Sequence, residues 1–591
     1  MNEIIINGNN HRYLSELDEF KYYLPDGIIN KTKPDVGGTY IAANCDCNYI
    51  IVCPFKDLVD SIVMDNNNKY EVFKCYGGVN ESEFKTYMER TTVHKIAVTY
   101  DSFSSKIINW INNYKDWRVL VDEYHLILED MDYRYDAISN LINNIKIFNH
   151  YTFLSATPIN VDFEIPELKK LQHYKVVWNN NRTVTVQRIQ CSKLNLGLVK
   201  FIDDFMQGNC NIDNIPVEKL FIFCNSVKLI NQVLETLKLD QNDVKICCAN
   251  RIRNRKILGK YNIESVTAPN KKLNFFTKKG FQGCNMFTNN GLIVIVSDGS
   301  KENTLVDIST TLEQIAGRLR ENEEYHNIFN SIIIHLFSYV GYNISDNKFN
   351  QIMTEKESNS KILISGYNKL NNDEKNIYNQ KLNLESEIVS IINNEMVYNE
   401  LKRQSFINKQ RIRSQYKNDN CMLAGYRDGS SRFTPNDIIT VEGIEVFKDK
   451  IKKMVTISYK QLLKNYLDIT NEELIKEYDI EYPEFSLFKK YLKESEMNTL
   501  KWNKDKMMKK VSDIKLLNKV FMNIYRKGFI SSKELKILIK NEFDRLNISI
   551  TPKASLILDN KLYNVTEIRK TIDGKTVRGY ELGTKIFNFS I

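Results

Sequence analysis

The chain has 591 residues, which is too long for one hydrophobic core and predicts about three to five domains. Its 42% hydrophobic and 26% charged residues are typical of a globular protein. No apolar run approaches a membrane span, and the N-terminal sequence MNEIIINGNN lacks a basic segment followed by an apolar one. We therefore expect no membrane association and a cytoplasmic location. The eleven cysteines are scattered without a CxxC pair, which favours reduced thiols over a zinc site.

Charge is distributed unevenly along the chain. Residues 401–591 contain 38 Lys and Arg against 24 Asp and Glu, a net charge of +14, whereas residues 1–400 have a net charge of −5. A basic C-terminal part suggests contact with a polyanion such as nucleic acid. The alternative is compositional drift, because the chain is rich in Asn, Lys and Ile, as an AT-rich genome would produce.

The first candidate site is a glycine-containing turn at 31–43, with the sequence KTKPDVGGTYIAA. Backbone N–H groups in such a turn, just before a helix, can point at an anion and cradle phosphates. Against the phosphate-loop pattern GxxxxGK[ST], the window 32–39 matches at Gly37 and Thr39. An ordinary Gly-Gly turn is the simpler explanation of these residues taken alone.

The same window departs from the pattern at two positions, where Thr32 replaces the first glycine and Gly38 replaces the lysine. Either the site binds nucleotide poorly, or another cation replaces the lysine. Lys33 is the nearest candidate within the loop, and Lys31 lies behind it. Tyr40 completes the set of candidate nucleotide-binding residues.

The second candidate site follows a short apolar run within 118–128, whose sequence is RVLVDEYHLIL. The run predicts a buried strand that ends in Asp122 and Glu123, with His125 two residues later. Acids in this position commonly hold Mg²⁺ on a bound nucleotide and polarise the attacking water. The alternative is an ordinary strand end that runs into a polar loop.

Several other apolar runs end in polar residues, as buried parallel strands do where α/β sheets bind ligands. We expect such strands, alternating with helices, at 49–54, 95–102, 153–158, 220–224, 244–248 and 291–298, whereas 274–286 runs from an apolar start into a Gly-punctuated polar loop. A helix is expected over 311–322, where the spacing of Gln314, Gly317 and Arg318 would place them on one face. A solvated basic helix is the alternative for this last segment.

The order of a Gly-Gly-Thr loop, Asp-Glu-x-His, Ser-Ala-Thr and Gln-x-x-Gly-Arg-x-Arg resembles the superfamily 2 (DEAD/DEAH-like) helicases. The resemblance covers 30–340 and implies two tandem RecA-like domains that use ATP and Mg²⁺. The composition and the lysine-less loop are also similar to replication helicases of large phages, and more remotely to herpesvirus origin-binding proteins. A phage protein would act in the host cytoplasm.

The resemblance also implies residue roles. Thr39 and Asp122 would lie near Mg²⁺, and Glu123 would be the catalytic base. The residues that would couple the nucleotide to nucleic acid are His125, Ser155 and Thr157, and those facing the γ-phosphate from the second domain are Gln314, Arg318 and Arg320. An arginine in this role contributes about 10³–10⁵ in rate. The family commonly spaces its two arginines by three residues, and here the spacing is two, so the resemblance does not decide which one reaches the phosphate.

In this family, nucleic acid lies across both RecA-like domains and is gripped by its backbone, so binding should tolerate many sequences and weaken with salt. The positions that match the family's contact segments are Lys56, Ser102, Asn225, Lys278 and Gly283. We expect DNA rather than RNA, with replication proteins as possible partners.

The C-terminal part resembles a winged helix. Helices are expected over 511–526 and 531–546, and a shorter one after Pro552. Asp573-Gly574 then predicts a hairpin turn, with Lys575 and Arg578 on or near the wing, as well as Arg569 and Lys570. Winged helices bind DNA but also serve as protein-contact modules. Apolar spacing over 382–396 predicts a connecting helix upstream.

The predicted domains are RecA-like domain 1 (1–180), RecA-like domain 2 (181–340), a helical, basic accessory region (341–510) and a winged-helix-like domain (511–591). The function expected from them is an NTP-dependent DNA helicase or translocase in phage replication or recombination. The alternative is a non-hydrolysing nucleic-acid-binding protein with a degenerate helicase fold. The lysine-less loop at 32–39 is the feature that would distinguish the two.

Overall fold

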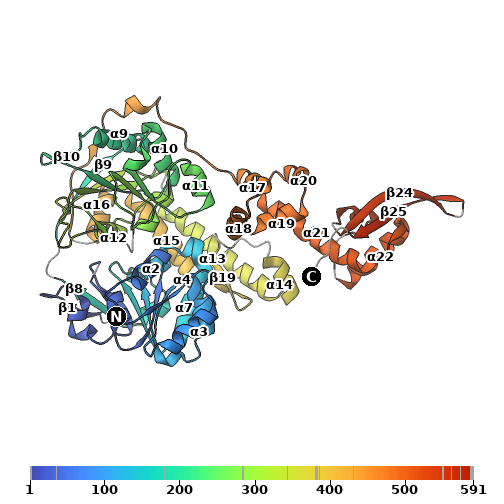
Figure 1. Ribbon diagram of the computed structural model, residues 1–591, viewed down its shortest axis with the longest axis horizontal. Coiled ribbons are helices and arrows are strands. Elements are labelled where there is room, and N and C mark those ends of the chain that lie inside the picture. The colour runs from blue at the N-terminus through green and yellow to red at the C-terminus, as the bar shows by residue number, and fades with distance from the viewer. Residues whose placement is uncertain are drawn as a thin grey trace. The chain divides into compact units, whose positions relative to one another are not determined.

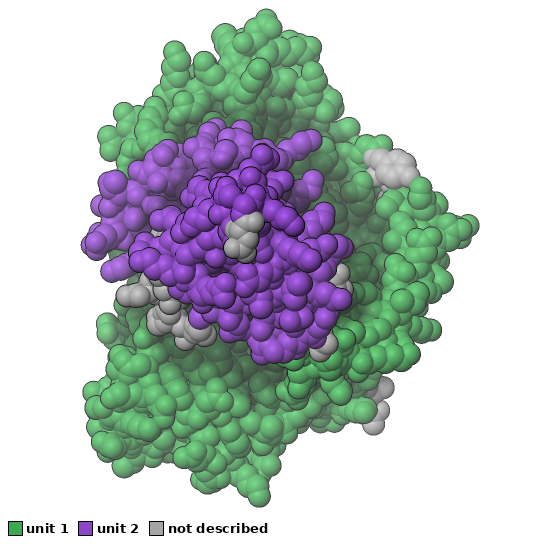
Figure 2. Space-filling model, turned by 90° about the vertical axis from the view of Figure 1, so that its right-hand side faces the viewer, with its two compact units in different colours: residues 1–250, 254–456 green, residues 251–253, 457–591 purple. Residues whose placement is uncertain are grey.

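The computed structural model describes every residue except 1–2, 35, 179–181, 282–284, 342–343, 380–383, 385, 430–431, 547, 549–550, 561, 573 and 586–591. The chain divides into two compact units, which Figure 2 shows in different colours. The first comprises residues 1–250 and 254–456, and the second comprises 251–253 and 457–591. Among the described residues, no helix combines the length and apolar character that crossing a membrane requires.

The first unit begins with a parallel sheet of eight strands within the described residues (Figure 1). Their spatial order is β1 (Glu3–Asn7), β8 (His173–Val177), β2 (Gly27–Asn30), β7 (His150–Ser155), β6 (Trp117–Asp122), β3 (Asn48–Cys53), β5 (Lys95–Thr99) and β4 (Val72–Cys75). Successive side chains point to opposite faces, and both faces are apolar, as in sheets covered by helices on both sides.

Different helices cover the two faces of this sheet. Ile50 and Val52 share an apolar cluster with α3 and α7, whereas Ile51 shares another with α1 and α2. The bounds are α1 (Gly38–Asn44), α2 (Lys56–Val63), α3 (Glu81–Arg90) and α7 (Met131–Asn144). The helices therefore leave the carboxyl ends of the strands available for a site.

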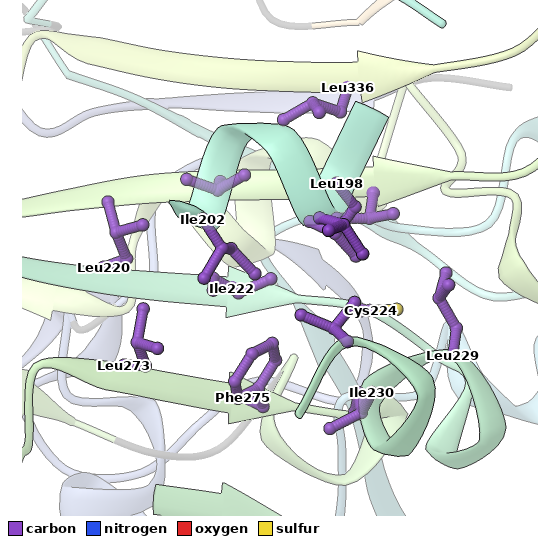
Figure 3. Close-up of a cluster of buried hydrophobic side chains, with 14 of the residues drawn as sticks. Leu198, Ile202, Leu220, Ile222, Cys224, Leu229, Ile230, Leu273, Phe275 and Leu336 are labelled. Carbon is purple, nitrogen blue, oxygen red and sulfur yellow. The ribbon is translucent and has the colours of Figure 1, made fainter. Parts of the chain in front are cut away.

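A second parallel sheet follows in the same unit. Its order is β13 (Val244–Cys247), β14 (Leu273–Phe276), β12 (Lys219–Phe223), β16 (Gly291–Ser297), β18 (Ile332–Phe337), β9 (Val184–Gln190) and β21 (Phe433–Pro435), and β22 (Ile439–Thr440) also pairs with β9. Figure 3 shows Leu198 and Ile202 of α9 (Leu194–Met206) over Leu220 and Ile222 of β12. The predicted α/β class with two parallel sheets is confirmed.

The predicted helix over 311–322 is too long. Helix α12 (Thr311–Ala316) ends at Gly317, and β17 (Leu319–Arg320) then pairs with β15 (Met286–Phe287). Glycine favours a helix end, and a Cβ atom at Gly317 would lie 2.9 Å from Pro34 Cγ. Gln314 is therefore helical, whereas Gly317 ends the helix and Arg318 follows it, so these three residues do not share one helix face as predicted.

The expected helix over 382–396 is also wrong where the structure describes it. This segment contains a hairpin of β19 (Val389–Ile392) and β20 (Glu395–Tyr398), whose turn residues Asn393 and Asn394 both have positive φ. Asparagine tolerates that backbone better than most residues. The helices around the hairpin are α13 (Asp346–Asn368), α14 (Asn372–Asn379), α15 (Glu400–Gln415) and α16 (Asp419–Asp428).

The second unit is helical and ends in a small antiparallel sheet. Its elements are α17 (Tyr459–Asp468), α18 (Glu472–Glu481), α19 (Glu484–Tyr491), α20 (Glu494–Thr499), α21 (Lys504–Ile524), β23 (Gly528–Ser531), α22 (Ser532–Arg545), a 3-10 helix (Ala554–Asp559), β24 (Tyr563–Ile572) and β25 (Lys575–Lys585). From α21 onward the order is helix, strand, helix, short helix and hairpin, and the winged helix itself stays a prediction. The domain boundaries at 180, 340 and 510 stay predictions.

Candidate active site

The phosphate-loop candidate connects β2 to α1. Gly37 precedes α1 with a φ of +85°, which glycine adopts without strain. Gly38 begins the helix, and a Cβ atom there would lie 2.3 Å from Leu154 Cδ2 on β7. Close packing of α1 on the sheet therefore explains why glycine occupies the position where the phosphate-loop pattern has lysine.

The two acids are buried at the carboxyl end of β6. Glu123 has a φ of +48°, a left-handed conformation that costs a non-glycine residue on the order of 1–3 kcal/mol. The N–H of Glu123 donates to Asp122 Oδ1 at 3.0 Å, and the Tyr100 hydroxyl donates to the carbonyl oxygens of Asp122 (2.9 Å) and Glu123 (3.3 Å). These bonds hold the sharp turn through which consecutive residues line the same cavity.

Two lysines of the loop have different surroundings. Lys31 directly follows β2 and is buried, and its Nζ lies 3.8 Å from Glu123 Oε1. Lys33, the nearer candidate in the sequence, is exposed and does not line the cavity that contains the acids. The structure thus reverses the order in which the sequence ranks these lysines, because the chain turns between them.

A cavity of about 220 Å³ joins the predicted nucleotide-binding residues. The sequence-predicted residues that line it are Gly37, Gly38, Thr39, Tyr40, Asp122, Glu123, Arg318 and Arg320. The first six belong to the part of the chain that forms the first parallel sheet, called here the first sheet domain. The two arginines belong to the part that forms the second sheet, the second sheet domain. One polar cavity is therefore lined by the loop, the acids and the arginines, although they are scattered over almost 300 residues of sequence.

Gln314 connects the two sheet domains beside this cavity. Its Nε2 donates to Thr157 Oγ1 at 2.9 Å and to Glu123 Oε2 at 3.4 Å. The Nε of Arg318 donates to the carbonyl oxygen of Gln314 at 2.7 Å, which fixes the guanidinium next to the glutamine. The polar end of α12 in the second domain therefore contacts Glu123 and Thr157 of the first domain.

The three coupling candidates form a hydrogen-bonded chain behind the acids. His125 Nδ1 lies 2.8 Å from Ser155 Oγ, which accepts a hydrogen bond from the N–H of Thr157 at 3.0 Å. The same His125 nitrogen lies 3.5 Å from Glu123 Oε2. Together with Gln314, this chain provides a continuous path from the catalytic-base candidate to the second domain.

The two acids have opposite pKa shifts. Burial raises the pKa of Asp122 to about 6, although the nearby Lys31 charge opposes this. Burial also acts to raise the pKa of Glu123, but Lys31, His125 and Arg318 outweigh it and hold that pKa below its usual value. Glu123 is consequently ionised at neutral pH, as a proton acceptor must be.

The nucleic-acid candidates have different surroundings. Ser102 accepts a hydrogen bond from Thr99 Oγ1 at 3.1 Å and is buried. Lys278 pairs with Asp130 (2.9 Å) and Glu129 (3.3 Å), and its N–H donates to Asn225 Oδ1 at 3.1 Å. The remaining candidates are Lys56, whose Nζ lies 5.4 Å from the centre of the Tyr76 ring, Lys575 and Arg578 on β25 of the second unit, and Gly283, which lies outside the described residues.

The cavity also includes residues that no motif marked. Ser61 belongs to α2, and Asp65 and Asn68 follow that helix. Asn285 lies just before β15 in the second domain and also lines the cavity. Sequence patterns offer no signal for such residues, because only the fold brings them to the phosphate loop.

No family model and no curated protein matches this chain. Among solved structures, it is similar to Mss116p bound to ssRNA and AMP-PNP, with 14% identity over 66% of this chain and 83% of that chain and a TM-score of 0.38. The helicase Lhr of Mycobacterium smegmatis bound to ssDNA and AMP-PNP has 13% identity over 53% of this chain and 44% of that chain, with a TM-score of 0.35. The type ISP restriction-modification enzyme LlaBIII bound to DNA has 10% identity over 89% of this chain and 38% of that chain, with a TM-score of 0.37.

Proposed function

We propose that the protein is an NTP-dependent helicase or translocase that hydrolyses ATP between its two sheet domains and moves along nucleic acid. The observation that carries this proposal is the shared cavity, in which two acids and the phosphate loop of one domain meet two arginines of the other. When a hydrolytic site is divided between two domains, hydrolysis is linked to the movement of one domain relative to the other. A binding protein that does not move along nucleic acid does not need this link.

The cavity residues fit the chemistry of phosphoryl transfer to water. Thr39 and Asp122 offer hydroxyl and carboxylate oxygens, the hard ligands that Mg²⁺ prefers, and would hold it beside the phosphates. Bound Mg²⁺ would stabilise charge on the transferring phosphoryl group. Glu123 would accept the proton of the attacking water, and Arg318 and Arg320 would stabilise negative charge from the second domain.

The nucleic-acid contacts belong to the same proposal. Basic and polar residues at strand ends of both domains, together with Lys575 and Arg578 on the β24–β25 hairpin, would contact the sugar-phosphate backbone. We favour DNA, and replication or recombination in a phage as the setting, with replication proteins as partners. The basic composition of residues 401–591 supports the DNA contact.

ATP hydrolysis by wild type and Glu123→Gln, with and without single- and double-stranded DNA and RNA, tests the enzymatic part. We expect turnover that nucleic acid stimulates and that Glu123→Gln reduces by about 10²–10⁴-fold. Absence of turnover above the variant with every nucleic acid would leave the non-hydrolysing binding protein, which the glycine at position 38 favours.

Salt dependence of DNA binding tests the hairpin. The double variant Lys575→Ala, Arg578→Ala should lower the slope of log affinity against log salt by up to about two, because two phosphate contacts are lost. A matched control is Lys146→Ala, which removes an exposed lysine of the first unit. An unchanged affinity and slope would indicate that the hairpin contacts a protein partner.

A further inference from the structure

The phosphate loop does not provide the ammonium group that its pattern normally supplies. A side chain at Gly38 would meet Leu154, which is fully buried in the core of the first sheet. A lysine there would require the core to repack, which typically costs about 1–3 kcal/mol. The cation for the phosphates must therefore come from another place in the cavity.

Lys31 is the cation that the first domain brings to the same space. Its ammonium group lies 3.8 Å from Glu123 Oε1, and its side chain lines the cavity with Thr39 and Asp122. Its side chain is only 9% exposed, so the charge is directed inward rather than solvated. A buried lysine next to a carboxylate in a polar cavity is well placed to bind a phosphate.

Backbone hydrogen bonds fix the direction of Lys31. Its N–H donates to the carbonyl oxygen of Ser155 at 2.9 Å, and its carbonyl oxygen accepts from Trp178 Nε1 at 2.9 Å. The next residue, Thr32, has a φ of +51° and donates through Oγ1 to the carbonyl oxygen of Val176 at 2.6 Å. This turn separates Lys31, which lines the cavity, from Lys33, which is exposed.

We propose that Lys31 replaces the missing phosphate-loop lysine and binds the β- and γ-phosphates of the nucleotide. The proposal rests on the proposed function, because it assigns a residue to that same site. The ammonium group pairs with Glu123 in the structure. When phosphates enter, its three N–H donors on a flexible stem can turn to their oxygens and leave Glu123 to the attacking water.

Affinity and turnover of Lys31→Met test this assignment, since methionine keeps an unbranched apolar side chain and removes the charge. We expect the affinity for a fluorescent ATP analogue and the ATPase rate each to fall roughly 10- to 100-fold, the effect of losing charged hydrogen bonds. Lys31→Arg should restore part of the affinity. Thermal melting of each variant shows whether it is folded, and Lys146→Met is the matched control on an exposed lysine.

The outcomes separate this proposal from the proposed function. If wild type hydrolyses ATP and folded Lys31→Met retains affinity and rate within about twofold, Lys31 is not the phosphate ligand, and the function stands. A loss with Lys33→Met in place of Lys31→Met would overturn the assignment in the same way. If wild type binds the analogue without turnover and Lys31→Met abolishes binding, the ligand assignment stands, and the hydrolytic function fails.

Discussion

Each parallel sheet has a buried histidine, His125 just after β6 and His335 within β18, that lies within hydrogen-bonding distance of the serine that ends a neighbouring strand. His125 Nδ1 lies 2.8 Å from Ser155 Oγ in the first sheet domain, and His335 Nε2 lies 3.0 Å from Ser297 Oγ in the second. The residue types and distances are nearly the same. A search for His–Ser pairs alone would treat the two places as equivalent.

The surroundings of the two pairs differ. The first adjoins Glu123 and a cavity shared with the second domain. The second is enclosed, because the Tyr426 hydroxyl lies 2.7 Å from His335 Nδ1, and burial together with Arg188 lowers the pKa of His335 to about 3. A neutral, closed network stabilises a fold, whereas a charged network beside a cavity can act on a ligand. Charge and access, rather than residue type, distinguish the candidate site.

Removal of the arginine whose charge lowers the pKa of Glu123 should give the largest effect. We expect Arg318→Ala to lower the ATPase rate by about 10³–10⁵-fold, because the guanidinium is held by the Gln314 carbonyl group beside Glu123. Single-turnover ATPase kinetics measure this loss. Arg182→Ala, which removes an exposed arginine that pairs with Glu321, is the matched control. A larger loss for Arg320→Ala would assign the phosphate contact to that residue instead.

The pH dependence of kcat/KM should reflect the acids next to His125 and not the enclosed network around His335. Because the pKa of Asp122 is raised to about 6, this carboxyl is protonated at lower pH and would hold Mg²⁺ poorly. The rate should therefore fall about tenfold per pH unit below about pH 6, while Glu123, with its lowered pKa, stays ionised near that pH. Kinetics between pH 5 and 8 check this, and a flat profile would contradict it.

Substitution of the two histidines by phenylalanine should separate their roles. His335→Phe leaves Ser297 and Tyr426 without this partner, and we expect a loss of about 1–3 kcal/mol in the free energy of unfolding with an unchanged ATPase rate per folded molecule. His125→Phe should in addition lower the stimulation of ATPase by nucleic acid. Urea unfolding and ATPase assays measure both effects. Equal losses of ATPase rate in the two variants would contradict the difference in role between the two histidines.

Apolar runs predicted β3, β5, β6 and β7 of the first sheet and β12, β13 and β16 of the second, since a few adjacent apolar residues indicate a buried parallel strand. The runs did not predict β1, β2, β4, β8, β9 or β18. The acids at 122 and 123 were predictable for the same reason, because they directly follow such a run. The end of α12 at Gly317 was missed although glycine favours a helix end, and only the fold shows that Pro34 of the other domain lies against this glycine. The choice between Lys31 and Lys33 was also hidden, since it depends on a single left-handed residue between them.

Removing one buried tyrosine hydroxyl, either beside the acids or beside His335, should give the smallest effects. Tyr426→Phe removes the hydroxyl next to His335, and Tyr100→Phe removes the one that donates to the carbonyl oxygens of Asp122 and Glu123. Each variant should lose about 0.5–1.5 kcal/mol in the free energy of unfolding. Only Tyr100→Phe should also slow ATPase, on the order of tenfold, because its hydroxyl braces the left-handed turn that places the acids. The free energy of unfolding and the ATPase rate, measured on the same preparations, test this expectation. A lower ATPase rate for Tyr426→Phe would show that the network around His335 also affects the candidate active site.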